Sequence, residues 1–170
     1  MPEAETSDLF LTVMRNVAAT VTVVTATHDG KHYGLTVSAF SSVSLDPPLV
    51  LVCIDKRSSS FAAIKGAGGF TVNFLAADAE DTAMHFASKT EDKFASVAHR
   101  SPSMQVAGPW LAEAAFAYFE CENVDIIDAG DHDVFVGRVH HGARINLEPP
   151  LMYWNGAFPK FARPDQVVSG

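Results

Sequence analysis

A helical repeat of apolar side chains opens the chain. Apolar residues between positions 9 and 17 recur three and four residues apart, so they share one face of an α-helix, and Ser7 or Asp8 can cap its N-terminus. We expect residues 1–7 to be a loose end before this helix. The residues of the apolar face are Leu9, Phe10, Val13, Met14 and Val17.

β-Branched and alternating stretches then predict six or seven strands. A turn centred on Asp29-Gly30 joins the first two strands, and the apolar run at 49–54 is typical of a strand buried on both faces. Two short helices are expected at 61–65, where a serine among residues 58–60 can cap the helix, and at 79–87. The predicted strands cover 21–27, 33–40 with an extended continuation at 41–44, 49–54, 70–75, 115–127, 134–145 and 151–154.

This order of elements favours a mostly β, mainly antiparallel fold with short helices. Strands dominate and few helices alternate with them, so a closed barrel is expected rather than a doubly wound parallel sheet. The 170 residues suit a single domain over 1–170, and 48% apolar against 19% charged residues is typical of a globular chain. A mean hydropathy of +0.11 is high for a monomer and suggests apolar surface hidden in an oligomer.

The charge balance restricts the partners. Twelve basic against 20 acidic residues give a net charge of −8, which disfavours nucleic acid but allows a local anion site. The acidic, polar residues 1–10 do not resemble a signal peptide, and the run at 49–54 is too short to span a membrane. Two cysteines, Cys53 and Cys121, cannot build a disulfide framework. We therefore expect a soluble cytoplasmic protein.

The sequence lacks the common catalytic motifs. It has no Gly-x-Ser-x-Gly elbow for a serine hydrolase and neither of the glycine-rich nucleotide-binding motifs. Its seven histidines include no pair at a zinc-ligand spacing with a third partner, so no metal site is expected.

Three segments carry chemistry that is harder to dismiss. Small hydroxyl side chains alternate along 34–42, where a flat ligand can lie against the backbone, unless this is an ordinary polar strand face. In 53–60 a strand ends and a helix begins, with basic and hydroxyl residues at the junction. This junction is either a phosphate-binding site or a capped helix with solvated Lys and Arg. In 130–132, Gly-Asp-His, the histidine can donate to a ligand carbonyl, or it is a turn histidine held by the aspartate.

Taken in order, these segments and several others resemble the short flavin reductases that supply reduced flavin to two-component monooxygenases. The similarity runs from about Phe10 to Phe158, and the ordered set is far more specific than any one piece. The matching stretches are 21–25, 34–44, 47–50, 53–59, 70–73, 86–87 with 93–94, 130–132 and 150–153.

The resemblance implies an FMN-binding split β-barrel of six or seven strands in a Greek-key-like order, usually a homodimer with flavin at the subunit interface. It also implies FMN or FAD as the flavin, NADH or NADPH as the reductant, and a partner oxygenase that receives the reduced flavin. Hydride would pass from nicotinamide C4 to flavin N5, so the protein needs no acid–base pair of its own. NADH is favoured over NADPH because a 2′-phosphate would meet acidic residues: Glu120, Glu122, Asp125, Asp128, Asp131 and Asp133.

Residue by residue, the resemblance implies that Thr36 and Ser38 line the isoalloxazine edge and that residues 57–59 lie near the ribityl phosphate. His132 would face the nicotinamide and bind its carboxamide. Cys53 is interpreted as a small packing residue and not as a nucleophile. Gly130 and Asp131 would accompany His132 at the nicotinamide. The full cofactor-site prediction comprises Thr36, Val37, Ser38, Ala39, Ser41, Ser42, Cys53, Ile54, Asp55, Lys56, Arg57, Ser58, Ser59, Ala87, Lys93, Phe94, Gly130, Asp131, Tyr153 and Phe158.

Three alternatives belong to other classes of protein. A flavin-binding electron-transfer or storage module would use the same barrel but lack a nicotinamide slot. The Gly-Asp-His segment counts against this alternative. An oxidase of the pyridoxamine-phosphate type would need a basic site for the phosphate of its substrate. A purely structural dimer would need neither 36–38 nor 53–59 for packing.

Overall fold

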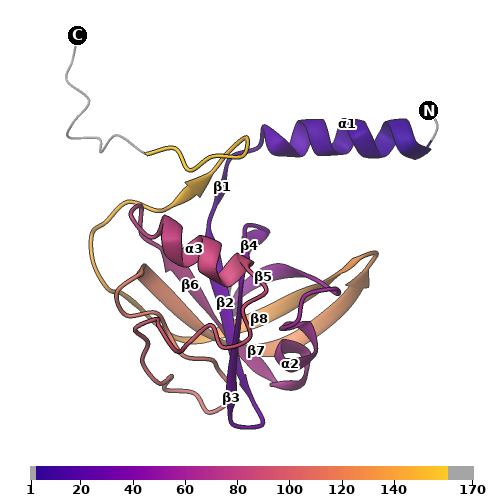
Figure 1. Cartoon of the computed structure of the whole chain (residues 1–170). Helices are drawn as coiled ribbons and strands as arrows, with labels where there is room; N and C mark the ends of the chain where they lie inside the picture. Colours follow the sequence, from indigo (N-terminus) through magenta and orange to yellow (C-terminus); the bar gives the residue numbers. More distant parts are fainter. Residues whose placement is uncertain (1–2, 161–170) are drawn as a thin grey trace.

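A curled antiparallel sheet of seven strands forms the body of the protein, and a two-stranded sheet lies at one end of it (Figure 1). The computed structural model describes residues 3–160. The large sheet has the order β3-β2-β6-β7-β8-β5-β4, and β1 pairs with β9 in the small one. The elements are α1 (Glu3–Arg15), β1 (Ala19–Thr20), β2 (Thr22–His28), β3 (Lys31–Val37), β4 (Phe40–Leu45), β5 (Pro48–Asp55), α2 (Phe61–Gly66), β6 (Gly69–Leu75), α3 (Glu80–Ala87), β7 (Ala115–Ala129), β8 (His132–Arg144) and β9 (Met152–Tyr153).

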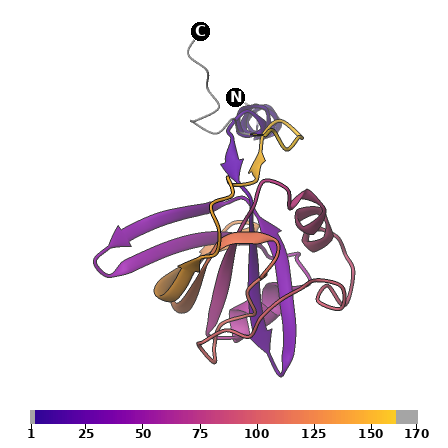
Figure 2. The same ribbon diagram turned by 90° about the vertical axis from the view of Figure 1, so that its left-hand side faces the viewer.

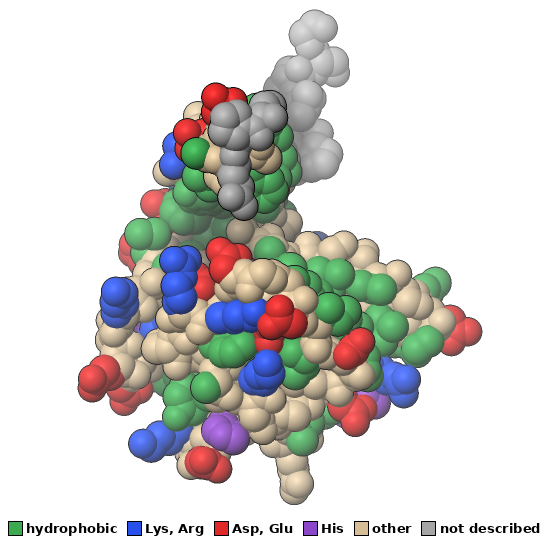
Figure 3. Space-filling model, turned by 90° about the vertical axis from the view of Figure 1, so that its right-hand side faces the viewer, with side chains coloured by type: hydrophobic (Ala, Val, Ile, Leu, Met, Phe, Trp, Pro, Cys, Tyr) green, Lys and Arg blue, Asp and Glu red, His purple; other side chains and the backbone are tan. Residues whose placement is uncertain are grey.

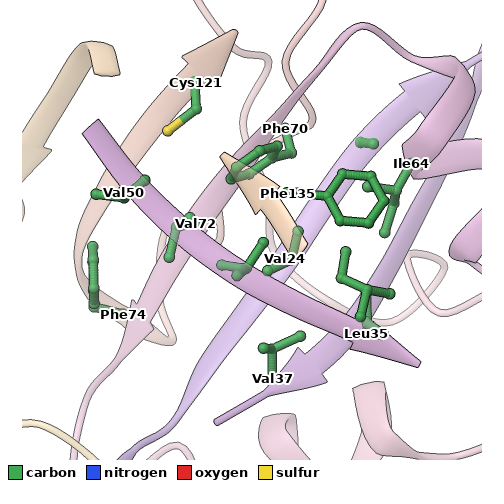
Figure 4. Packing of buried hydrophobic residues seen from close by; sticks show 13 residues of the cluster. Val24, Leu35, Val37, Val50, Ile64, Phe70, Val72, Phe74, Cys121 and Phe135 are labelled. Atoms are coloured by element: carbon green, nitrogen blue, oxygen red, sulfur yellow. The ribbon is translucent and has the colours of Figure 1, made fainter. Parts of the chain in front are cut away.

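The core fills the inside of the curl, around β6, whose residues are all buried. Figure 4 shows Phe70 and Val72 of β6 together with Phe135 of β8 and Ile64 of α2 in this cluster. Burial of each large apolar side chain contributes roughly 1.5–3 kcal/mol to stability. The cluster therefore fixes α2 and the neighbouring strands relative to one another, and with them the segments that end at the candidate site.

Two hairpins have the turns that the sequence predicts. Asp29 and Gly30, with φ of 49° and 73°, join β2 to β3, and a type I′ turn requires such positive values. Ala129 pairs with His132, so Gly130 and Asp131 form the two-residue turn between β7 and β8, and Gly130 has a φ of 72°. This second turn places His132 at the first position of β8.

The chain changes from one edge of the sheet to the other inside a stretch predicted to be a single strand, 33–40. β3 and β4 are separated by residues 38–39 and form opposite edges of the sheet. At the crossing the Cys53 amide donates to the Ala39 carbonyl at 3.0 Å. The mostly β, antiparallel class is confirmed. The predicted closed barrel is not, because no ladder joins the edge strands β3 and β4 within residues 3–160. The two edges are connected by the chain segment that crosses between them.

The prediction that 49–54 is buried on both faces is wrong. Along β5, Val50, Val52 and Ile54 are buried, whereas the alternate residues are only half-buried. A continuous apolar run does not distinguish a strand with two covered faces from one whose second face is open in the single chain. β6, between β2 and β7, is buried along its whole length, and the first five residues of β2 are buried on both faces as well.

α1 begins earlier than predicted and projects from one end of the body (Figures 1 and 2). The predicted cap at Ser7 or Asp8 is wrong, and residues 3–7 are helical rather than loose, while residues 1–2 lie outside the described part of the chain. The C-terminal end of α1 is fastened to the segment after β9. There the Asn155 amide donates to the Arg15 carbonyl at 2.9 Å, and the Trp154 indole donates to the Asn16 carbonyl at 3.2 Å.

The two short helices lie close to their predicted positions. Ser60 occupies the N-cap of α2, but its hydroxyl donates to the Gly34 carbonyl at 3.1 Å instead of capping the helix. Ala83 and Phe86 of α3 pack into a second buried cluster above β3 and β2. No helix in the described residues is both long and apolar enough to cross a membrane.

Candidate functional site

Two adjoining hollows form a groove between β3 and the C-terminal end of α3, which we call the β3–α3 groove. The larger hollow has a volume of about 750 Å³ and the smaller about 260 Å³, and they share Thr36 and Ala87. The larger is lined by Leu35, Thr36, Asp55, Arg57, Ser58, Ser59, Phe86, Ala87, Ser88, Lys89 and Lys93. The smaller is lined by Val21, Thr36, Ser38, Ala83, Met84, Ala87, Tyr153 and Phe158.

β3 and α3 approach closely because Gly34 has no side chain. A Cβ at this position would lie 2.7 Å from the Phe86 ring, so any other residue would push α3 outward. Two residues further along β3, the Thr36 hydroxyl donates to the Ala83 carbonyl at 2.6 Å. The hydroxyl-bearing face predicted for this strand therefore lines the groove. The hydroxyl proton of Thr36 is already donated to α3, so this residue can only accept a hydrogen bond from a ligand.

The basic end of the groove contains an internal ion pair. The Arg57 guanidinium donates to Asp55 from Nε at 3.1 Å and from its terminal nitrogen at 2.8 Å, and these hydrogen bonds lower the pKa of Asp55 to about 2. The Arg57 side chain is 81% exposed. Asp55 occupies two of the five guanidinium N–H donors, so a ligand phosphate can bind the remaining donors beside the carboxylate or take its place at Nε.

The predicted cradle of free backbone amides is wrong in part. The amides of Arg57, Ser58 and Ser60 are already bonded, to Asp55 Oδ1, the Asp55 carbonyl and Ser58 Oγ respectively. The side-chain donors of the larger hollow that an anion can reach are consequently those of Arg57, Ser58, Ser59 and Lys89, which all line it.

Lys93 forms part of the wall of the groove. Its side chain is buried, and Nζ donates to the Phe86 carbonyl at 2.7 Å and to the Gly34 carbonyl at 3.1 Å. Removal from water lowers the pKa of this amine. Lys93 thus joins the end of α3 to β3, which makes it a structural part of the predicted flavin site as well as a lining residue.

His132 lies beside the basic end of the groove, on the neighbouring strand. In the β5–β8 ladder Asp55 pairs with His132, and the His132 Nδ1 lies 2.7 Å from Asp131 Oδ1. The imidazole lowers the pKa of the Asp131 carboxyl through this contact. The histidine side chain is 40% exposed, so its other nitrogen is accessible to a ligand.

Several predicted flavin-site residues do not line the groove with their side chains. Val37, Ile54 and Phe94 are packed in the core, so only their backbone can contact a ligand. Other predicted residues lie at the crossing, on β4, on or directly after β5, or at the β7–β8 turn: Ala39, Ser41, Ser42, Cys53, Lys56, Gly130 and Asp131. Cys53 is half-buried, and burial raises the pKa of its thiol, which supports the interpretation that it is no nucleophile.

Part of the lining was not predicted from the sequence. Ala83 and Met84 of α3 line the groove beside the predicted Ala87, and their helical spacing contained the signal, although nothing in the sequence indicates which face meets β3. Leu35 and Phe86 line the larger hollow from positions that alternation along a strand or helix assigns to the core.

The acidic residues near His132 are less available than their number suggests. Glu120 is buried and accepts from the amides of Ser103 and Met104 at 2.9 Å. Asp128 and Asp133 are paired with lysines. The count of acids that favours NADH over NADPH therefore overstates the negative charge that a 2′-phosphate would meet.

A split antiparallel sheet with an aromatic-edged groove and a basic end defines a protein that binds a flat, phosphorylated cofactor. The flavin reductase like domain model matches residues 14–162, and the chain belongs to this family. It is 43% identical over 154 residues to the reductase component of a 4-nitrophenol 4-monooxygenase/4-nitrocatechol 2-monooxygenase from Rhodococcus opacus, covering 89% of this chain and 80% of that one. It is 38% identical to a flavin reductase (NADH) from Kitasatospora aureofaciens, covering 91% and 81%.

Solved structures show the same fold. An NADH:FAD oxidoreductase from Streptomyces globisporus, in complex with NAD and FAD fragments, superposes with a TM-score of 0.86 at 31% identity, covering 97% of this chain and 98% of that one. The flavin reductase HpaC in complex with NADP+ superposes with a TM-score of 0.83 at 32% identity, covering 91% and 97%. The fold class and the family expected from the sequence are both confirmed.

The buried amine of Lys93 predicts a specific pH dependence of stability. Because its pKa is lower in the folded chain than the ordinary 10.5, the unfolded chain binds this proton more tightly. The free energy of unfolding of the wild type, relative to Lys93→Met, should therefore rise with pH between the lowered pKa and 10.5. Urea unfolding of both proteins from neutral pH to about pH 10 measures this difference. A difference that stays flat with pH would contradict the assignment.

Proposed function

We propose that this flavin reductase binds its flavin in the β3–α3 groove, takes hydride from NADH, and works as a homodimer in the cytoplasm. The observation that carries the proposal is the juxtaposition of a narrow groove, the Arg57 end and the His132 turn in one chain of this family. Reduced flavin then passes to a partner monooxygenase, a role supported by relatives that are named as the reductase component or reductase subunit of a monooxygenase. The free thiols Cys53 and Cys121 suit a reducing compartment.

The lining of the groove fits a flavin. A flat ring needs a slot with small side chains along one wall, and Thr36, Ser38 and Ala87 supply them. Tyr153 and Phe158, whose ring centroids lie 5.5 Å apart, form an aromatic edge in the smaller hollow. A ribityl phosphate needs donors at the other end, which the side chains of residues 57–59 offer.

The bound flavin supplies the redox chemistry, because its ring accepts a hydride from a reduced nicotinamide. The protein holds the two rings in position, and this converts a bimolecular encounter into an oriented one. In our proposal His132 holds the nicotinamide. With its Nδ1–H donated to Asp131, the neutral ring can accept a hydrogen bond from the carboxamide amine at Nε2, and the protonated ring can donate to the carboxamide oxygen.

The homodimer is supported by apolar surface that the single chain leaves uncovered. Phe10 is 62% exposed and Val13 53% exposed on α1, and Figure 3 shows hydrophobic side chains gathered along this helix above a body whose charges of both signs are interspersed. A patch of this kind on a projecting helix marks an interaction site. The half-open face of β5 is a second such surface. A second copy of the chain explains both without invoking another partner.

Replacing His132 should impair nicotinamide binding and leave flavin binding intact. We expect His132→Ala to raise the KM for NADH roughly tenfold or more, the equivalent of one strong hydrogen bond, with the flavin Kd within about twofold. His140→Ala is a matched control, because its ring is similarly exposed on the same strand and also pairs with a carboxylate, that of Glu122. The assay follows NADH oxidation with added FMN, FAD or riboflavin.

Two outcomes would contradict the proposal. Flavin binding without NADH oxidation by the wild type would instead favour the electron-transfer module. An unchanged KM for NADH in His132→Ala would reject the role of His132 in nicotinamide binding.

The Asp55–Arg57 pair should set the contribution of the phosphate to flavin affinity. Arg57→Ala is expected to weaken FMN binding about tenfold through loss of a charged contact, while riboflavin, which has no phosphate, is unaffected. Asp55→Asn removes the competing carboxylate and should tighten FMN binding severalfold, again without an effect on riboflavin. Quenching of flavin fluorescence gives both constants. Equal changes for FMN and riboflavin would place the phosphate elsewhere.

The apolar face of α1 should be required for the dimer. We expect size-exclusion chromatography with light scattering to give twice the chain mass of 18.2 kDa for the wild type, and a monomer for Phe10→Glu combined with Val13→Glu. Leu11→Glu is the matched control, since Leu11 is 51% exposed but lies off this face of the helix. A wild-type monomer would remove the dimer from the proposal, and a dimer in the double variant would assign the contact to another surface.

A further inference from the structure

A set of ion pairs outside the groove ties α2 and β5 to the β7–β8 turn. At its centre is the Asp133 carboxylate, whose side chain is 1% exposed. Lys65 of α2 lies 2.7 Å from Asp133 Oδ2, and Lys56, directly after β5, lies 3.4 Å from Oδ1. These two ammonium groups lower the pKa of Asp133, so the buried carboxylate is charged and compensated from both sides.

Lys56 differs from Lys65 because it also contacts the turn itself. Its Nζ donates to the Gly130 carbonyl at 2.6 Å and to Asp128 Oδ2 at 2.7 Å. Its backbone amide donates to the Asp131 carbonyl at 3.0 Å. One residue therefore contacts the turn at both of its central positions and the last part of β7. The next residue of the chain after this turn is His132.

The ladders of β8 with β5 and with β7 reach His132, and beyond them the turn consists of exposed residues. Gly130 and Asp131 are exposed, and the hydrophobic core clusters include no residue between Ile126 and Phe135 in the described part of the chain. Beyond the ladders, hydrogen bonds rather than packed side chains therefore hold the turn. Charge-assisted hydrogen bonds are about twice as strong as neutral ones, and Lys56 makes two of them here, to the Asp128 carboxylate and to the Gly130 carbonyl.

We infer that Lys56 is a positioning residue, which holds the Gly130-Asp131 turn and with it His132 beside the basic end of the β3–α3 groove. The side chain of Lys56 does not line the groove, so it acts through the turn and not on the flavin. This gives the side chain of Lys56 a role beyond the sequence-based expectation, in which residues 53–56 pass the flavin largely through backbone groups. The inference rests on the role proposed above for His132, and it goes beyond it by assigning what keeps that histidine in place.

The chain offers a matched control for this inference. Lys65 shares the Asp133 carboxylate with Lys56, and its Nζ lies 5.3 Å from the centre of the Phe61 ring, on α2 and away from the turn. Lys65→Met and Lys56→Met remove the same charge from the same buried carboxylate. Both variants should therefore lose thermal stability, and the contacts to the turn are the main difference between them.

The test measures the KM for NADH, the flavin Kd and the melting temperature for Lys56→Met, Lys56→Arg and Lys65→Met, each with and without His132→Ala. We expect Lys56→Met to raise the KM for NADH roughly tenfold while the flavin Kd stays within about twofold of the wild-type value. Lys56→Arg, which keeps the charge, should have a KM close to that of the wild type. Lys65→Met should change the KM by no more than about twofold. In the His132→Ala background Lys56→Met should add little, because a residue that acts through another shows strong coupling in a double-mutant cycle. Amide hydrogen exchange over residues 128–133 should be faster in Lys56→Met than in Lys65→Met.

Distinct results would overturn the inference. Equal effects of Lys56→Met and Lys65→Met on the KM would reduce Lys56 to a structural ion pair, and additive effects with His132→Ala would make Lys56 a direct nicotinamide contact. If His132→Ala alone leaves the KM unchanged, the proposed role of His132 fails and the positioning role fails with it. The exchange rates then still report whether Lys56 fixes the turn, so the two failures are distinguishable.

Discussion

The pairing of β5 with β8 is the contact on which the candidate site depends. It sets Asp55 opposite His132, so the segment that carries Arg57 and the turn that carries the histidine end at the same place. Along the ladder Val52 pairs with Phe135, and both side chains are fully buried in the main cluster. The spacing between the phosphate end and the histidine is thus set by core packing, which resists small displacements far better than a loop does.

Charged residues near the site serve the architecture as much as the ligand. Lys56, Lys65 and Lys93 are all engaged with protein acceptors, and each joins two elements that are distant in the sequence. Arg57 is paired as well, but at an exposed position where its partner can be exchanged. The local basic character of a chain with a net charge of −8 therefore provides two exposed cations that line the groove, Arg57 and Lys89, together with a framework of fixed ones.

Local patterns predicted the elements well, because hairpin turns and strand periodicity depend on residues close together in the chain. Asp29-Gly30 and Gly130 demonstrate this, since their positive φ values follow from residue type. The class of fold and the family also followed from ordered motifs. The open face of β5 was not predictable from the sequence. A continuous apolar run is expected both for a strand face buried within its own chain and for one buried by a neighbouring molecule.

The lining of the site was only partly predictable for a similar reason. Gly34 determines how near α3 lies to β3, and this contact between distant segments decides that Ala83 and Met84 face the groove. The ion pairs of Lys56 likewise join residues far apart in the sequence, so a lysine that local reasoning assigned to a ligand is committed to the β7–β8 hairpin. Sequence alone identified most of the segments of the site, and the packing determined which side chains of each segment face it.

The Asp55–Arg57 pair has a consequence for how the groove behaves between turnovers. A phosphate that binds the edge of the guanidinium facing Asp55 would compete with a carboxylate already seated there, and on its departure the carboxylate would be within reach to return. The charge of Arg57 is therefore compensated with or without a bound anion, and other anions in solution meet a site that is already neutralised. The groove in this way contains its own substitute for a ligand anion.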